Sequence, residues 1–180
     1  MQLIRSRHLL RRTTMAAASM ILSLAGTGCG SDSVLGPGLG YGNLSASGAV
    51  TASGSGLALF QSVSSGGTNL FQILIAPISQ STTSWQLQIA NYSGRLEEGT
   101  YNLSALSPSS PDPTASLYYT SGGTMQMFNS TSGQLTITSS STSSVRGTFT
   151  FTATDPEGGT ATVIANGTFN AQCAPGLTCL

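Results

Sequence analysis

Charged side chains are scarce in this chain of 180 residues, at 7% of the total, and lysine is absent. The single histidine, His8, precedes an apolar N-terminal run, so the chain after that run contains neither lysine nor histidine. These absences exclude a Ser-His-Asp triad, a histidine-activated cysteine and a Ser-Lys dyad from that part. Paired carboxylates are the remaining route to hydrolysis.

The few charges that follow Cys29 are mostly negative. Arg95 and Arg146 are the only basic residues there, against six acids, which leaves a formal charge of −4. A basic patch cannot be built from two arginines, so nucleic acid and anionic lipid headgroups are not expected partners. The six acids are Asp32, Glu97, Glu98, Asp112, Asp155 and Glu157.

The N-terminal segment has the pattern of an export signal. Four arginines among the first twelve residues precede Met15–Ala25, an apolar run too short to span a bilayer. Gly26-Thr27-Gly28-Cys29 follows and resembles the lipobox of bacterial lipoproteins, although Gly26 stands where that motif has an aliphatic residue. The resemblance implies that Cys29 is lipidated and becomes the new N-terminus. The alternatives are ordinary cleavage that frees the mature chain, and an N-terminal helix that stays in the fold.

This pattern predicts three parts. Residues 1–28 are expected to be a signal peptide, residues 29–42 the lipidated cysteine with a Gly/Pro/Ser linker, and residues 43–180 a single all-β domain. The expected location is the cell envelope, with the chain attached to the outer membrane through the lipid on Cys29. The alternative is a soluble protein of the periplasm or the medium.

Cysteine usage agrees with export. Besides Cys29 there are only Cys173 and Cys179, which lie six positions apart around a short Pro/Gly segment. Export makes a disulfide between them plausible, and the pair completes the cysteine count. Metal binding by these two cysteines would lack further ligands, so no metal or cofactor is predicted.

The best-patterned stretch is Gln134–Gln172. In Thr148–Thr154 threonines alternate with Phe149, Phe151 and Ala153, which is typical of a strand with one buried face. Shorter alternating runs precede and follow it, and Asp155–Gly159 has the Pro and Gly of a hairpin turn. The stretch therefore predicts a meander of three antiparallel strands.

Other alternating runs predict further strands, and no run of adequate length favours a helix. About nine or ten short strands at regular spacing predict an all-β fold, either an antiparallel β-sandwich or a small open barrel, that ends in the meander. The expected strands before the meander are Leu57–Val63, Leu70–Ala76, Ser84–Ala90, Thr100–Ser104, Ala115–Thr120 and Thr124–Phe128.

A family resemblance covers the C-terminal half. The order LEEGTYNL at Leu96–Leu103, SGQLTIT at Ser132–Thr138, GTFTFTA at Gly147–Ala153 and NGTFN at Asn166–Asn170 is similar to a group of uncharacterised bacterial lipoproteins. The resemblance implies an all-β fold and a surface or periplasmic location, and it supplies no catalytic residues.

Candidate ligand-binding residues are aromatic. Trp85, Tyr118 and Tyr119 are the candidates for contacting a glycan or a peptide, because one of two neighbouring tyrosines on a strand must point away from the core. Trp85 alternates with glutamines, which also fits a core position. The adjacent Glu97 and Glu98 fit solvated turn charges better than a catalytic pair.

These observations favour a non-enzymatic structural or interaction module of the cell envelope. A carbohydrate- or peptide-binding module that uses exposed aromatics is the alternative, and a carboxylate-dependent hydrolase is the third possibility. Any site is expected in the loops Gly94–Gly99 and Ser107–Pro113, because the outward face of the meander offers mainly threonine hydroxyls.

Overall fold

The computed structural model describes residues 39–65, 68–79, 81–107, 110–177 and 179. These residues form nine β-strands, and within them no helix is long and apolar enough to cross a membrane. The strands are β1 (Tyr41–Gly48), β2 (Ala52–Ser65), β3 (Thr68–Ala76), β4 (Thr83–Asn91), β5 (Gly99–Asn102), β6 (Thr114–Ser121), β7 (Thr124–Ser140), β8 (Ser144–Thr154) and β9 (Thr162–Cys173).

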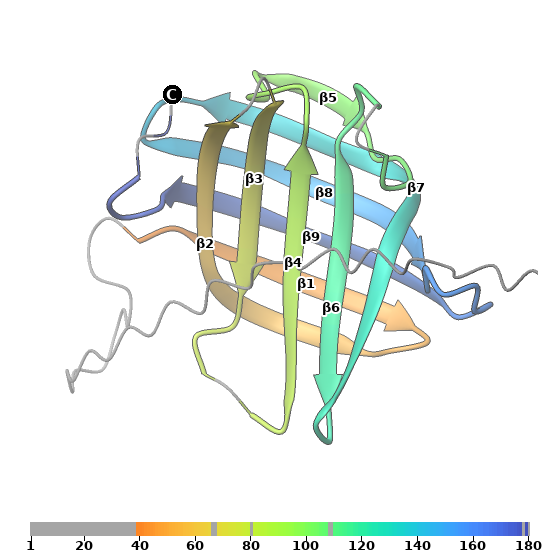
Figure 1. The fold of residues 1–180 in the computed structure, drawn as a ribbon. Helices are drawn as coiled ribbons and strands as arrows, with labels where there is room; N and C mark the ends of the chain where they lie inside the picture. The colour runs from red at the N-terminus through yellow and green to blue at the C-terminus, as the bar shows by residue number, and fades with distance from the viewer. Residues whose placement is uncertain (1–38, 66–67, 80, 108–109, 178, 180) are drawn as a thin grey trace, which may run out of the picture. The chain divides into compact units, whose positions relative to one another are not determined.

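The strands form a closed antiparallel barrel. Neighbours follow the order β7-β6-β4-β3-β2-β1-β9-β8, and β8 pairs again with β7, so eight strands close on themselves and β5 lies beside β7 as an extra strand (Figure 1). The all-β class, the antiparallel pairing and the final meander are confirmed. The predicted sandwich and the open form of the barrel are wrong, because pairing between β7 and β8 joins the two ends of the sheet.

Two long strands make this closure possible by changing partners along their length. The first half of β2 pairs with β1 and its second half with β3. Likewise, the first half of β7 pairs with β6, and the second half with β5 on the same side and β8 on the other. Figure 1 shows both strands curving between two groups of strands that cross each other. A long strand that pairs with both groups of strands carries the sheet from one group to the other.

A glycine allows one of these two long strands, β7, to bend. Gly133 of β7 has a φ of +148°, and a Cβ there would lie 2.3 Å from the carbonyl oxygen of Thr150 on β8. The pairing between β7 and β8 shifts register between Ser130 and Ser132, just before this glycine. The bulge bends β7, and only glycine allows its backbone to lie this close to β8.

The core is the interior of the barrel. Alternate residues of each strand point inward, as the burial of Val145, Phe149, Phe151 and Ala153 along β8 shows. Burial of each large apolar side chain stabilises the fold by about 1.5–3 kcal/mol. The largest fully buried side chains are Phe60, Phe71, Phe151, Ile73, Ile75, Leu87, Ile89, Leu103, Leu117, Leu135, Ile137 and Val145.

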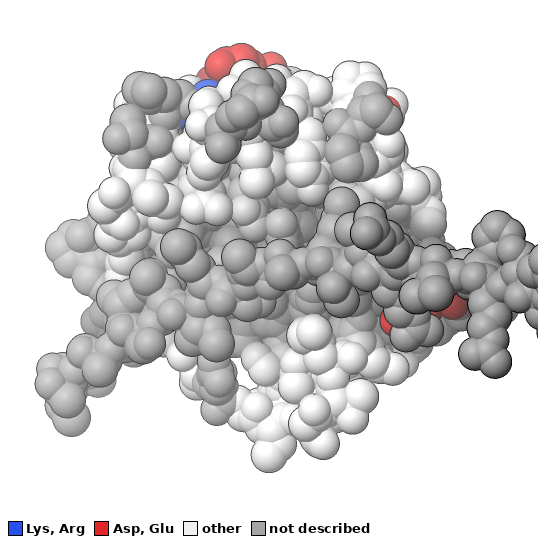
Figure 2. All heavy atoms as spheres, in the orientation of Figure 1, with Lys and Arg blue, Asp and Glu red and all other residues white. Residues whose placement is uncertain are grey.

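The outer surface carries few charges. In Figure 2 most of the described atoms are uncharged, with acidic atoms at the top edge beside an arginine and a few more on the right side. Along β8 the outward positions Thr148 and Thr150 are exposed hydroxyl residues. The outside of the barrel is therefore polar but nearly neutral.

Candidate functional site

Trp85 lies inside the barrel near one of its ends. It sits on β4, where its inward side chain is only 7% exposed and packs with the core. Its indole Nε1 faces β2 and lies 3.8 Å from the point that a Cβ on Gly54 would occupy. This nitrogen forms no hydrogen bond with any described residue. Among the described residues the indole N–H is therefore a donor without a partner, held in place by apolar packing.

A cleft of about 370 Å³ opens beside this nitrogen. Its walls come from the β1–β2 turn, the first half of β2, the loop after β3 and the start of β4. Pro77 stands at one side and Trp85 at another, and no charged residue lines it within the described chain. Six lining residues carry hydroxyl groups: Thr51, Ser53, Ser55, Ser79, Ser81 and Thr83. The cleft is thus a neutral, polar site suited to hydrogen bonding.

The two tyrosine candidates lie apart from this cleft. Tyr119 pairs with Trp85 across β4 and β6, but its partly buried ring packs against the core. Tyr118 precedes Tyr119 on β6, so its half-buried side chain points to the other face of the strand. Burial and the nearby Tyr92 raise the pKa of Tyr118, which a hydrogen bond with the Ser116 side chain partly offsets. The three aromatics do not form one exposed platform.

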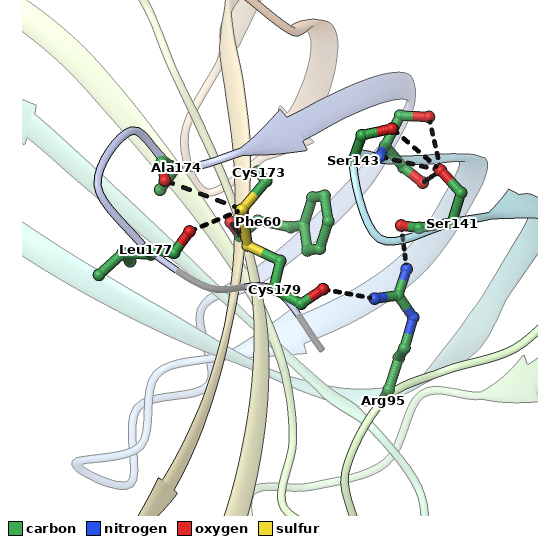
Figure 3. The surroundings of a disulfide bond; sticks show 9 residues. Phe60, Arg95, Ser141, Ser143, Cys173, Ala174, Leu177 and Cys179 are labelled. Atoms are coloured by element: carbon green, nitrogen blue, oxygen red, sulfur yellow. Dashed lines mark hydrogen bonds between the residues drawn. A yellow bond between two sulfur atoms is a disulfide. The ribbon is translucent and has the colours of Figure 1, made fainter.

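The predicted disulfide is confirmed. Cys173, the last residue of β9, is bonded to Cys179, which is 4% exposed and joins the core (Figure 3). The amide of Ala174 donates to the carbonyl of Phe60 at 2.9 Å, so the segment that follows β9 is tied to β2. Cys29, the predicted lipidation site, lies outside the described residues.

Arg95 fastens the C-terminal segment to the barrel. Its guanidinium lies 5.3 Å from the centre of the Phe60 ring and donates to the carbonyl oxygen of Cys179 at 3.4 Å. It also donates to the Ser140 hydroxyl and to the carbonyl of Ser141 in the β7–β8 turn (Figure 3). Within the described chain this arginine has only neutral acceptors and an aromatic face as partners. The loop Gly94–Gly99, predicted as a site, thus contains a structural clamp.

The carboxylates are dispersed. Glu97 and Glu98 are exposed between β4 and β5, and Asp112 lies in a separate loop before β6. Asp155 accepts a hydrogen bond from the amide of Glu157 at 2.8 Å, which is the geometry of a turn-forming aspartate. Among the described residues, no group of three His, Cys, Asp or Glu could hold a metal ion.

The sequence interpretation identified Trp85 but missed the cleft around it. The signal in the sequence was the stretch of small residues Ala52–Gly56, whose small side chains leave space beside Trp85. That Pro77 and this stretch meet depends on the pairing of β2 with β3, which no local pattern contains.

Comparison with known proteins gives a family and no function. Residues 72–171, from β3 to β9 and more than half of the chain, match the family described as a domain of unknown function, DUF6252, so the chain belongs to that family. Neither the curated proteins nor the solved structures contain a significant match.

Proposed function

We propose that this member of the DUF6252 family is an exported, lipid-anchored β-barrel of the cell envelope that acts as a structural or interaction module without catalysis. The observation that carries the proposal is the disulfide between Cys173 and Cys179, which packs into the barrel end. Disulfides of this structural kind persist in oxidising compartments outside the cytosol. Cys29 behind an apolar run then supplies the anchor.

The distribution of reactive groups supports a non-catalytic role. General acid–base catalysis needs two titratable groups within reach of one substrate. In the described chain the carboxylates are divided among three turns, Asp155 accepts a hydrogen bond within its own turn, and Arg95 donates to the carbonyl of Cys179. A carboxylate-dependent hydrolase is the less favoured function for this reason.

A processing experiment tests the anchor. The full chain is expressed in a bacterium that has lipoprotein signal peptidase, with and without globomycin, and the mature product is analysed by intact mass. We expect a chain that starts at Cys29 with a diacylglyceryl group, and a larger precursor when globomycin is present. Cys29→Ser should abolish both the lipid and the membrane association. A mature chain with an unmodified Cys29 would overturn the anchor.

The second candidate function is binding of a neutral ligand in the cleft beside Trp85. The specific observation is the unpaired indole Nε1 that faces this polar cavity. A glycan stacked on exposed aromatic faces is less well supported, because the Trp85 ring is almost fully buried. Hydrogen-bonding groups, and not aromatic faces, would recognise the ligand.

A further inference from the structure

The first half of β2 has one edge without a partner strand. β1 pairs with Ala52–Leu57 on one side, whereas on the other side β3 reaches β2 only from Leu57 onward. β3 ends at Ala76, and its pairing with β2 stops at Leu57. Ser53 and Ser55 therefore lie beside a position that no described strand occupies.

The hydrogen-bond pattern shows which backbone groups face that position. The amide of Ala58 donates to the carbonyl of Gly40, which lies opposite it, so this is a hydrogen-bonded pair. In an antiparallel ladder such pairs alternate with non-hydrogen-bonded ones. Counting back along the continuous register, Ser53 and Ser55 fall on the non-hydrogen-bonded positions toward β1. Their amide and carbonyl groups point to the opposite, open edge.

This open edge is part of the cleft. Ser53, Gly54 and Ser55 line it and are exposed, and the Trp85 indole Nε1 lies 3.8 Å from the point that a Cβ on Gly54 would occupy. Residues two apart on a strand are about 7 Å apart, so Ser53 and Ser55 can pair with residues two apart on a second extended chain. The cleft thus offers a short ladder of backbone donors and acceptors, with one side-chain donor beside Gly54.

We propose that the open edge of β2 at Ser53–Ser55 binds an extended, uncharged peptide segment by strand addition, with the Trp85 indole N–H as an additional donor. Because the cleft contains no charge, an ionised side chain would lose its hydration without gaining a partner there. Main-chain hydrogen bonds supply affinity in this mode of recognition. The inference deepens and rests on the second candidate function, since it names the class of ligand.

A peptide fits the geometry better than a sugar. A sugar ring is usually recognised by stacking on an open aromatic face, and Trp85 is only 7% exposed. The strand edge, in contrast, has the regular alternation of N–H and C=O groups that another polypeptide shares.

The test uses the full chain carrying Cys29→Ser and a defined probe, the capped peptide acetyl-Thr-Val-Thr-Val-Thr-amide. Trp85 is the only tryptophan, so its fluorescence reports on the cleft directly. Amide shifts of Ser53 and Ser55 in NMR report on new hydrogen bonds at the edge. Acetyl-Thr-Pro-Thr-Pro-Thr-amide, which lacks the required N–H groups, is the matched peptide, and maltose is the glycan probe.

Strand addition predicts saturable binding of the first peptide only, with shifts at Ser53 and Ser55 and a change in Trp85 emission. Ser53→Pro removes an edge donor that β1 does not use and should weaken binding at least tenfold, while Thr148→Ala, at an exposed position of β8 that does not line the cleft, should bind as the parent does. Circular dichroism confirms that both variants fold. Trp85→Phe, followed by NMR, should weaken binding about two- to tenfold through loss of one hydrogen bond.

Two results would overturn the inference. Binding of maltose in place of the peptide, unchanged by Ser53→Pro, would assign the cleft to a glycan. No saturable shift with the first peptide up to its solubility limit would show that the edge does not recruit a strand. Neither result bears on the lipid anchor, because the tested chain lacks Cys29.

Discussion

Breaking the disulfide between Cys173 and Cys179 should destabilise the whole barrel and not only the chain end. The bond closes a loop with a sequence separation of six. For so short a loop, the entropy removed from the unfolded chain corresponds to roughly 2.4 kcal/mol. The cost is expected to appear globally because Cys179 is buried in the core, and because Ala174, which follows Cys173, donates to the carbonyl of Phe60 on β2.

The hydrogen bonds that hold the C-terminal segment to the barrel should survive reduction, so the expected loss is that of the disulfide alone. The carbonyl of Cys179 still accepts from Arg95, and the amide of Ala174 still donates to Phe60. We therefore expect the free energy of unfolding to fall by about 2–3 kcal/mol on reduction. For a domain of this size, that loss corresponds to a decrease in Tm of roughly 6–15 °C.

The assay is urea unfolding of the full chain with and without a reductant, followed by Trp85 fluorescence and by circular dichroism. The double variant Cys173→Ala/Cys179→Ala without reductant should match the reduced protein. Cys29→Ser is the control, and it should leave the difference between the two redox states unchanged.

A difference below about 0.5 kcal/mol in the free energy of unfolding between the oxidised and reduced protein would refute the expected effect on the whole barrel. It would mean that the disulfide restrains only a chain end that opens locally. Hydrogen exchange then distinguishes the two cases. The amides of Cys173 and Ala174, which donate to Ser143 and Phe60, would exchange faster while those of β8 stayed protected.

Three further perturbations test the packing and titration described above. Gly133→Ala should destabilise the fold by about 2–4 kcal/mol in thermal unfolding, because its Cβ would meet the Thr150 carbonyl. Gly122→Ala, which has open space around it and only the strain of its φ of +57°, should cost less, about 1–2 kcal/mol. Phe151→Ala should cost about 3–5 kcal/mol by urea unfolding, against less than about 0.5 kcal/mol for the exposed Thr150→Ala; equal effects would contradict the assignment of the inner face. The raised pKa of Tyr118 means that folding favours the neutral phenol, so its contribution is complete below pH 10, the ordinary value, and is lost as the pH rises through the folded-state pKa. Tyr118→Phe should flatten that part of the alkaline stability profile.

The local pattern of the strands was predictable because burial on one face leaves a period of two in the sequence. Phe149 and Phe151 are buried and Thr148 and Thr150 exposed, as their alternation indicates. The hairpin turn at Asp155–Gly159 was equally predictable, since Gly158 has a φ of +90° and Asp155 caps the turn.

The closure of the barrel was not predictable from such local signals. Thr124–Phe128 and Leu135–Ile137 were expected to be separate strands, because the polar segment Asn129–Gly133 between them has the composition of a loop. In the structure this segment is the bend of a single strand, β7. Its bulge lets the strand pair with β6 at one end and with β8 along the other. Both pairings join consecutive strands, and the local pattern missed only that a single strand makes both of them. The pairing of β1 with β9, as between Tyr41 and Asn170, links residues far apart in the sequence, so no short pattern contains it.

The same unequal pairing explains why the candidate site lies where it does. A barrel closes its sheet completely only if each strand is covered along its full length on both sides. β2 extends past the end of β3, so Ser53 and Ser55 keep backbone groups that closure does not use. In a chain with so few charged side chains, these groups and the indole N–H of Trp85 are hydrogen-bonding groups at a cavity that have no partner among the described residues. Recognition by this barrel is therefore best sought in its backbone at the open edge, and not among its carboxylates or its outward threonines.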